Sequence, residues 1–286
     1  MGSAGVMTGW LGDHAGLHWA PGIDQGSTHH VIVGGPERTL AADTTGRALL
    51  IERHDQRIEG LEQHLIGTVD QRTYWVVDSS DTFEETWIWS PPRPLIIGAT
   101  SAEFIPLSAA LQWLDFLREH RFCGACGQSM RPSSSDRGRQ CVSCSLISYP
   151  RVSPSIIILI TRGDDMLLAR SPRFTNGMYS TLAGFVEAGE SAEHACHREI
   201  FEEVRVHIHP PKFLGSQSWP FKHSLMLGYR AEWRSGEIQV DGVEIIDAQW
   251  FHPDRLPPLP QHASISRGLI DHFLTERGYP LTSHTA

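Results

Sequence analysis

Two pairs of cysteines, Cys123 with Cys126 and Cys141 with Cys144, constrain the folding of this chain more than any other feature. Each pair encloses two residues, and residues 127–140 separate the pairs. This spacing is typical of zinc ligands rather than of disulfides in a chain that shows no basic and apolar secretion signal. The knuckles occupy only residues 123–144, too few for an apolar core, so bound metal would supply their folding energy. We therefore expect one structural Zn²⁺ per chain.

The cysteines divide the 286 residues into regions of different character. Residues 1–28 are rich in Gly, His and Asp, show no regular period and are a candidate for disorder. Residues 29–120 contain short apolar runs between turn residues, which predicts a β-rich domain that ends in a helix. The zinc ribbon is expected over 121–149. Residues 150–286 mix strands with two long helices, which predicts an α/β layered domain.

Individual elements follow from the spacing of apolar residues. In the β-rich region we expect strands at 31–33, 48–51, 65–69, 74–77 and 87–89, with a hairpin over 69–74. The proline-rich stretch 90–94 is expected to end that region, and a helix should follow Pro106 and run to His120. Further on, we expect strands at 155–161 and 166–169 and helices at 191–204 and 264–277.

Charge and hydropathy exclude some classes of protein. The formal net charge of −9 argues against a general nucleic-acid coat protein, which would be basic, but leaves open RNA recognition at one local site. The longest apolar run, residues 156–160, is far too short to cross a bilayer, so we expect no membrane association. The cytoplasm is the expected location.

A cluster of carboxylates is expected on one helix. In the helix predicted over 191–204, Glu199, Glu202 and Glu203 fall within an arc of about 100°. Such neighbours repel each other by roughly 0.2–0.5 kcal/mol per exposed pair. Mg²⁺ or Mn²⁺ among the oxygens would remove that repulsion, since both ions prefer carboxylate and water ligands and bridge to phosphate. A solvated acidic face is the alternative interpretation.

Residues 184–206 strongly resemble the Nudix box, Gly-x5-Glu-x7-Arg-Glu-(apolar)-x-Glu-Glu-x-Gly-(apolar). The pattern departs only at Arg205, which stands where the family has its last glycine. That glycine would follow the helix in a left-handed conformation, where an arginine costs on the order of 1 kcal/mol. The resemblance implies the Nudix α/β/α sandwich as the fold of the C-terminal domain.

The resemblance also implies roles for residues. Several Mg²⁺ or Mn²⁺ ions per site would be held by the backbone carbonyl of Ala183 and by Glu199, Glu202, Glu203 and Glu244. Gly184, Glu190 and Arg198 would brace the loop and helix around these ligands. The implied chemistry is metal-assisted hydrolysis, in which the ions neutralise a pyrophosphate and activate a water. Glu202 or Glu203 would then take the proton of that water.

A second motif narrows the substrate. Residues 216–224 resemble the SQPWPFPxS array that marks the NADH pyrophosphatases within the Nudix family, although Ser218 and Lys222 replace two of its prolines. In this array Trp219 and Phe221 offer flat surfaces for a nucleobase or nicotinamide ring. The substrate-binding residues that the resemblance implies are Asp136, Tyr149, Phe185, Gln217, Ser218, Trp219, Pro220, Phe221, Lys222, His223, Ser224 and Ser266.

The order of β-rich domain, zinc ribbon, Nudix box and array resembles that of the NADH pyrophosphatases. The resemblance implies hydrolysis of NADH or NAD⁺ to a nicotinamide mononucleotide and AMP, removal of NAD caps from RNA 5′ ends, and a homodimer with substrate groups across its interface. One alternative is a Nudix hydrolase for ADP-ribose or a diadenosine polyphosphate, which the altered array motivates. Another is a catalytically silent module that binds nucleotides or RNA, against which the complete glutamate set argues.

Overall fold

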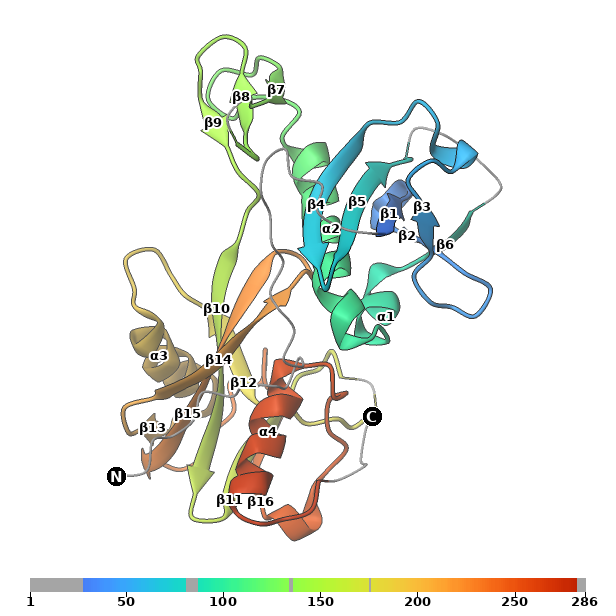
Figure 1. The fold of residues 1–286 in the computed structure, drawn as a ribbon. Helices are drawn as coiled ribbons and strands as arrows, with labels where there is room; N and C mark the ends of the chain where they lie inside the picture. The colour runs from blue at the N-terminus through green and yellow to red at the C-terminus, as the bar shows by residue number, and fades with distance from the viewer. Residues whose placement is uncertain (1–27, 81–86, 134–135, 175, 282–286) are drawn as a thin grey trace. The chain divides into compact units, whose positions relative to one another are not determined.

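The computed structural model describes residues 28–80, 87–133, 136–174 and 176–281 (Figure 1). The disorder expected for residues 1–28 falls almost wholly outside the described residues. The described chain divides into two compact units. The N-terminal unit holds residues 28–152 together with 220–223, and the C-terminal unit holds 153–219 and 224–281. The ribbon residues thus belong to the same unit as the N-terminal sheet.

A six-stranded mixed sheet forms the centre of the N-terminal unit, in the order β4-β5-β1-β2-β6 with β3 paired to β1. Its strands are β1 (Thr28–Gly34), β2 (Leu40–Ala42), β3 (Leu50–Glu52), β4 (Gln63–Val69), β5 (Arg72–Asp78) and β6 (Ile88–Ser90). The expected strands and the hairpin are confirmed, and Asp70 and Gln71 make its two-residue turn with φ of 46° and 62°. β2 was not expected, since two of its three residues are alanines, which are uncommon in strands. Short 3-10 turns occupy Pro36–Arg38 and Gln56–Ile58.

Two helices in this unit differ from the expectation. The proline-rich stretch does not simply end the sheet, because it begins α1 (Pro92–Ile97), whose first turn tolerates proline. The next helix, α2 (Ser101–Glu119), starts before Pro106 and holds that proline inside. A capping box sets this earlier start: the carboxylate of Glu103 accepts from the backbone N–H (3.1 Å) and hydroxyl (2.8 Å) of Thr100. The expected start at Pro106 was therefore wrong.

The C-terminal unit is built on a seven-stranded sheet in the order β13-β15-β10-β11-β16, with β12 paired to β10 and β14 paired to β15. Its strands are β10 (Ser153–Arg162), β11 (Asp165–Arg170), β12 (Leu182–Phe185), β13 (His207–Ile208), β14 (Lys212–Trp219), β15 (Ser224–Ser235) and β16 (Asp247–Phe251). The central pair, β10 and β15, is parallel. A 3-10 turn, Pro253–Arg255, follows β16.

Helices α3 (Ala192–Val204) and α4 (Ile265–Glu276) cover opposite faces of this sheet (Figure 1). Alternation along β10 separates two cores: Ile156 and Ile158 pack with residues of α3, whereas Ile157 packs with residues of α4. The predicted α/β/α sandwich is therefore confirmed. None of the helices in the described residues combines the length and the apolarity that a bilayer crossing requires.

Both ends of α3 are capped, and the C-terminal end has the predicted left-handed residue. The hydroxyl of Ser191 accepts a hydrogen bond from the backbone N–H of His194 at 3.2 Å. Arg205 follows the helix with φ 60° and ψ 20°, and its N–H donates to the carbonyl of Phe201. Its guanidinium lies 5.1 Å from the ring centroid of Phe201. The arginine thus adopts the left-handed conformation that glycine occupies in the family pattern.

Arg205→Gly should stabilise the protein relative to Arg205→Ala. Both variants lose the contact with Phe201, but only glycine relieves the positive φ, which should be worth about 1 kcal/mol. In a thermal unfolding scan, the glycine variant should melt about 2–4 °C above the alanine variant. Equal melting temperatures would show that the left-handed turn stores no strain.

Candidate active site

A close approach between β12 and α3 forms the floor of the site. Antiparallel pairing places Gly184 opposite Ile156 of β10, and the hydroxyl of Ser155 donates to the carbonyl of Gly184 at 2.9 Å. A Cβ atom at position 184 would lie 1.9 Å from the carboxyl carbon of Glu199. Only glycine therefore lets this carboxylate lie against the strand, because it has no side chain.

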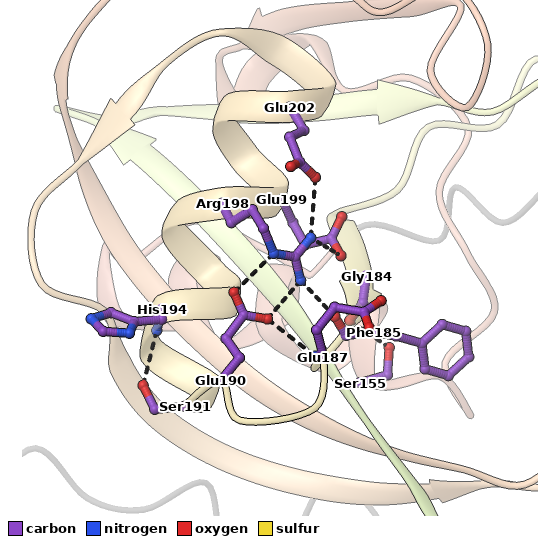
Figure 2. Close-up of polar contacts among 10 residues, drawn as sticks. All are labelled: Ser155, Gly184, Phe185, Glu187, Glu190, Ser191, His194, Arg198, Glu199 and Glu202. Carbon is purple, nitrogen blue, oxygen red and sulfur yellow. Dashed lines mark hydrogen bonds and ion pairs between the residues drawn. The ribbon is translucent and has the colours of Figure 1, made fainter.

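Arg198 links the loop before α3 to the glutamates of the helix, as Figure 2 shows. Its guanidinium donates to both carboxylate oxygens of Glu190 at 2.7 and 2.8 Å and to the backbone carbonyl of Phe185 at 2.9 Å. It also donates to Glu199 at 2.9 Å and to Glu202 at 3.1 Å. The Arg198 hydrogen bonds lower the pKa of Glu190 to about 2. One cation therefore bonds to three carboxylates and reduces the repulsion among them.

Glu203 lies deeper than its neighbours, with 5% of its surface exposed. Its Oε2 atom is buried and has no hydrogen-bond partner among the described residues. Burial, followed by repulsion from Glu199, Glu244 and Asp241, raises the pKa of Glu203 to about 8. Burial also raises the pKa of Glu199. Without a cation, burial and repulsion thus favour the protonated form of Glu203, whose Oε2 atom the described residues leave unpartnered.

The loop 239–245 brings additional carboxylates to this helix. The backbone N–H groups of Gln239 and Asp241 donate to the carbonyls of Val204 and Glu203 at 3.0 and 3.1 Å, which satisfies the last turn of α3. The carboxylate of Asp241 in turn accepts from the N–H groups of Val243, Glu244 and Ile245 at 2.9–3.1 Å. Asp241 was not predicted, although the Asp-Gly turn at 241–242 was the available signal.

These residues fit a hard divalent cation. The unpartnered oxygen of Glu203, the raised pKa values and the glycine that admits Glu199 describe a site where positive charge would be stabilising. Among the described residues, the four cysteines are the group of three or more potential ligands whose donor atoms all lie within 4.8 Å of one another. The glutamates do not converge in this way, and Arg198 bonds to Glu199 and Glu202 instead.

The array residues have different environments. Gln217 is 1% exposed, and its amide donates to the carbonyl of Ala263 at 2.7 Å and accepts from the N–H of Ile265 at 2.9 Å. It therefore fastens β14 to the start of α4. Ser224 is buried at the start of β15, and Trp219 packs against the core under α4. Ser218 and His223 are half-buried.

Ser266 is 3% exposed and joins α4 to the segment before β12. Its hydroxyl accepts from the N–H (3.1 Å) and the hydroxyl (2.9 Å) of Thr181 and lies 2.8 Å from the hydroxyl of Ser180. A serine oxygen has two lone pairs and one hydrogen, so these contacts use its full bonding capacity. Ser266 thus holds the backbone that leads to Ala183 and Gly184.

Among the remaining predicted substrate groups, Tyr149, Phe185 and Lys222 are exposed, Asp136 and Phe221 are half-buried and Pro220 is buried. In the ribbon, the hydroxyl of Tyr149 donates to Asp136 at 2.8 Å, a bond that raises the pKa of Tyr149. The structure therefore brings Tyr149 and Asp136 together. Both Tyr149 and Phe185 are exposed, at 54% and 53% of their surface, and Phe185 belongs to the C-terminal unit.

The four cysteines converge in the ribbon, whose strands are β7 (Met130–Pro132), β8 (Arg139–Cys141) and β9 (Ile147–Ser148). Sulfur–sulfur distances of 3.5–3.6 Å agree with the tetrahedron edge of about 3.8 Å that Zn–S bonds of about 2.3 Å imply. Backbone N–H groups of Cys144 and Ser143 lower the pKa of Cys141 to about 6. The buried core of the ribbon is only Cys123, Met130 and Cys141, so bound metal would supply much of the ribbon's stability.

Comparisons with known proteins agree with this geometry. Residues 151–273 match the NUDIX domain, and residues 118–149 match the NADH pyrophosphatase zinc ribbon domain. The NAD-capped RNA hydrolase NudC of Pseudomonas syringae pv. tomato is 49% identical over 216 residues, which cover 75% of this chain and 78% of that protein. The protein of the same name from Pseudomonas fluorescens Pf-5 is 44% identical over 250 residues, 86% of this chain and 90% of that protein. The chain belongs to the Nudix hydrolase family, with the zinc ribbon of the NADH pyrophosphatases.

Removal of the zinc should unfold the ribbon first. Metal analysis should find about one tightly bound zinc per chain, retained under mild chelation. Cys123→Ser should lower the melting temperature, because the ribbon has almost no apolar core to replace the metal. Cys196→Ser is the matched control: this thiol is also buried but lies on α3. A zinc-free protein with unchanged melting would refute the zinc site.

Glu203→Gln should stabilise the metal-free protein at high pH. The folded state holds the Glu203 proton more tightly than the unfolded chain, so this group favours folding below pH 4.5, and that contribution is lost as pH rises through about 8. An amide has no charge to bury, so at pH 9 the gain should be on the order of a few kcal/mol, and at pH 4 near zero.

Urea unfolding in the presence of a chelator at both pH values measures this difference. Glu202→Gln is the control, because the Glu202 side chain is 54% exposed and its removal should change stability little. A Glu203→Gln variant no more stable than the control at pH 9 would contradict the buried charge.

Proposed function

We propose that this protein hydrolyses the pyrophosphate of NADH and NAD⁺ to a nicotinamide mononucleotide and AMP, and that the same cut removes NAD caps from RNA 5′ ends. The observation that carries the proposal is the buried, unpartnered oxygen of Glu203 beside Glu199 and the loop of Glu244. The relatives named as NAD-capped RNA hydrolases and the match to the NADH pyrophosphatase ribbon support this substrate class.

We further propose that Mg²⁺ or Mn²⁺ is the catalytic cation. Glu199, Glu203, Glu244 and the carbonyl of Ala183 would hold it, with Glu202 at the exposed side. When bound, such an ion neutralises a pyrophosphate and lowers the pKa of a coordinated water. Oxygen ligands favour these hard ions, whereas the thiolates of the ribbon suit zinc.

The chain's own residues perform the remaining tasks. Arg198 holds Glu190 and the carbonyl of Phe185, which fixes the loop that faces the helix. Glu202 is the more exposed of the two candidate bases, so its carboxylate is free to accept the proton of an attacking water after it leaves Arg198. Trp219, Phe185 and Tyr149 would supply flat surfaces for the bases of the substrate.

We also propose a homodimer in the cytoplasm. Large apolar side chains are exposed along the ribbon and the segment that follows it, which favours a partner surface. They are Phe122, Val142, Leu146, Ile147, Tyr149 and Val152. The cytoplasm is proposed because thiolates that bind zinc persist where cysteines stay reduced.

The test of the function is the position of the broken bond. In ¹⁸O-water with Mg²⁺ or Mn²⁺, NADH should yield AMP and reduced nicotinamide mononucleotide, with label on one phosphate only. Attack of water at one phosphorus breaks the P–O–P bridge and leaves both phosphate–ribose esters intact. Free nicotinamide, or ADP-ribose as a product, would mean glycosidic cleavage and would overturn the proposal.

Variants should separate binding from chemistry. Glu203→Gln should lower kcat by about two to four orders of magnitude, since it removes a charge from the site of the cation. Trp219→Ala and Phe185→Ala should mainly raise KM, by the equivalent of about 1–3 kcal/mol for a lost stacking surface. Phe213→Ala is the matched control, because Phe213 is a similarly exposed aromatic at 47% on β14. A preference for ADP-ribose over NADH at equal concentration would favour another nucleoside diphosphate substrate.

A further inference from the structure

The middle of the substrate array is held by ionic contacts that the family pattern does not contain. Lys222 stands where the pattern has a proline, and residues 220–223 are part of the N-terminal unit. The ammonium group of Lys222 forms an ion pair with Glu119, the last residue of α2. This bond lowers the pKa of Glu119. Lysine has no proline ring to stiffen the loop. Its charge attaches the loop to α2 instead.

Arg38 holds the same loop from a second side. Its guanidinium donates to both carboxylate oxygens of Asp115 in α2, at 2.7–3.0 Å. The same group donates to the backbone carbonyls of Pro220 and, at 3.3 Å, of Lys222. The Arg38 and Asp115 side chains are 26% and 11% exposed, and their bidentate pair holds in place the guanidinium that bonds to the loop.

A third contact involves the aromatic residue of the loop. The guanidinium of Arg93, in the first turn of α1, lies 5.3 Å from the ring centroid of Phe221. Pro220 is therefore attached to Arg38, Phe221 to Arg93 of α1, and Lys222 to Glu119 of α2. Three contacts on consecutive residues leave this part of the array little freedom.

We propose that Arg38 and Glu119 are positioning residues for substrate recognition: together they fix the loop 220–223 in place of the proline that Lys222 replaces. The role rests on the proposed function of the array, while the attachment of the loop does not. In this arrangement the lysine serves as the anchor of the loop and not as a substrate contact.

The test compares Lys222→Met, Glu119→Gln, their double variant and Arg38→Gln in the full-length zinc-containing protein. Each single change in the ion pair should raise KM for NADH about two- to five-fold, as expected for a partly exposed pair, with kcat within about twofold of the unchanged protein. The double variant should be no worse than either single variant, because both remove the same interaction. Arg38→Gln should have the larger effect on KM.

Amide hydrogen exchange measures the loop itself. Exchange in the peptide that contains residues 220–224 should be faster in Lys222→Met and Arg38→Gln than in the unchanged protein. Lys222→Pro should restore slow exchange and low KM, and Glu119→Gln should have no further effect in that background. Asp164→Asn is the matched control: its pair with Arg277 has similar exposure, 48% and 45%, but lies in the turn between β10 and β11.

The outcomes separate this inference from the proposed function. Unchanged exchange and KM in Lys222→Met and Glu119→Gln, with normal turnover of NADH, would overturn the positioning role and leave the function intact. If the unchanged protein does not hydrolyse NADH, the proposed function fails and the exchange rates alone decide the attachment. Faster exchange in the variants then supports it, and unchanged exchange overturns it.

Discussion

Arg198 makes the carboxylate cluster of the C-terminal unit compatible with folding. Three glutamates, Glu190, Glu199 and Glu202, accept hydrogen bonds from its guanidinium, and a carbonyl of the loop accepts another. Without that cation, the carboxylates of α3 would repel each other across one turn of helix. Because the same guanidinium also bonds to the loop, Arg198 both reduces the repulsion among the carboxylates and positions the loop. An uncharged residue at this position would release both.

β12 and α3 approach closely at the site because Gly184 has no side chain. Gly184 admits the carboxylate of Glu199, and the neighbouring Phe185 remains exposed. Ser266 and Gln217 then connect the strands of this face to α4. The side chains of Ser266 and Gln217 were expected to bind substrate directly. In the structure they form hydrogen bonds with backbone groups of the protein. Their contribution to recognition would come from holding the surrounding backbone.

How much could be predicted from the sequence depends on the separation of the interacting residues. The box residues follow one another on a loop and a helix, so spacing alone predicts that Arg198 can reach Glu202, and the cap at Ser191 follows by the same reasoning. Arg38 escaped prediction because it bonds to residues tens of positions away, where no local period exists, whereas the local Asp-Gly turn at Asp241 was a usable signal. The start of α2 was misplaced because Pro106 was given more weight than the capping box of Thr100 and Glu103.

The position of Glu203 connects the stability of the fold to its chemistry. A carboxylate that is 5% exposed and repelled by Glu199 and Glu244 destabilises the folded protein at neutral pH when no cation is near. A ligand that binds only the folded state stabilises it by RT ln(1 + c/Kd), where c is its free concentration, so tighter binding or a higher concentration offsets more of that cost. A divalent cation at this oxygen would therefore stabilise the fold and prepare the site for a pyrophosphate in the same step. An apolar side chain in place of Glu203 would raise the stability of the metal-free protein. It would also remove the oxygen that a cation would bind.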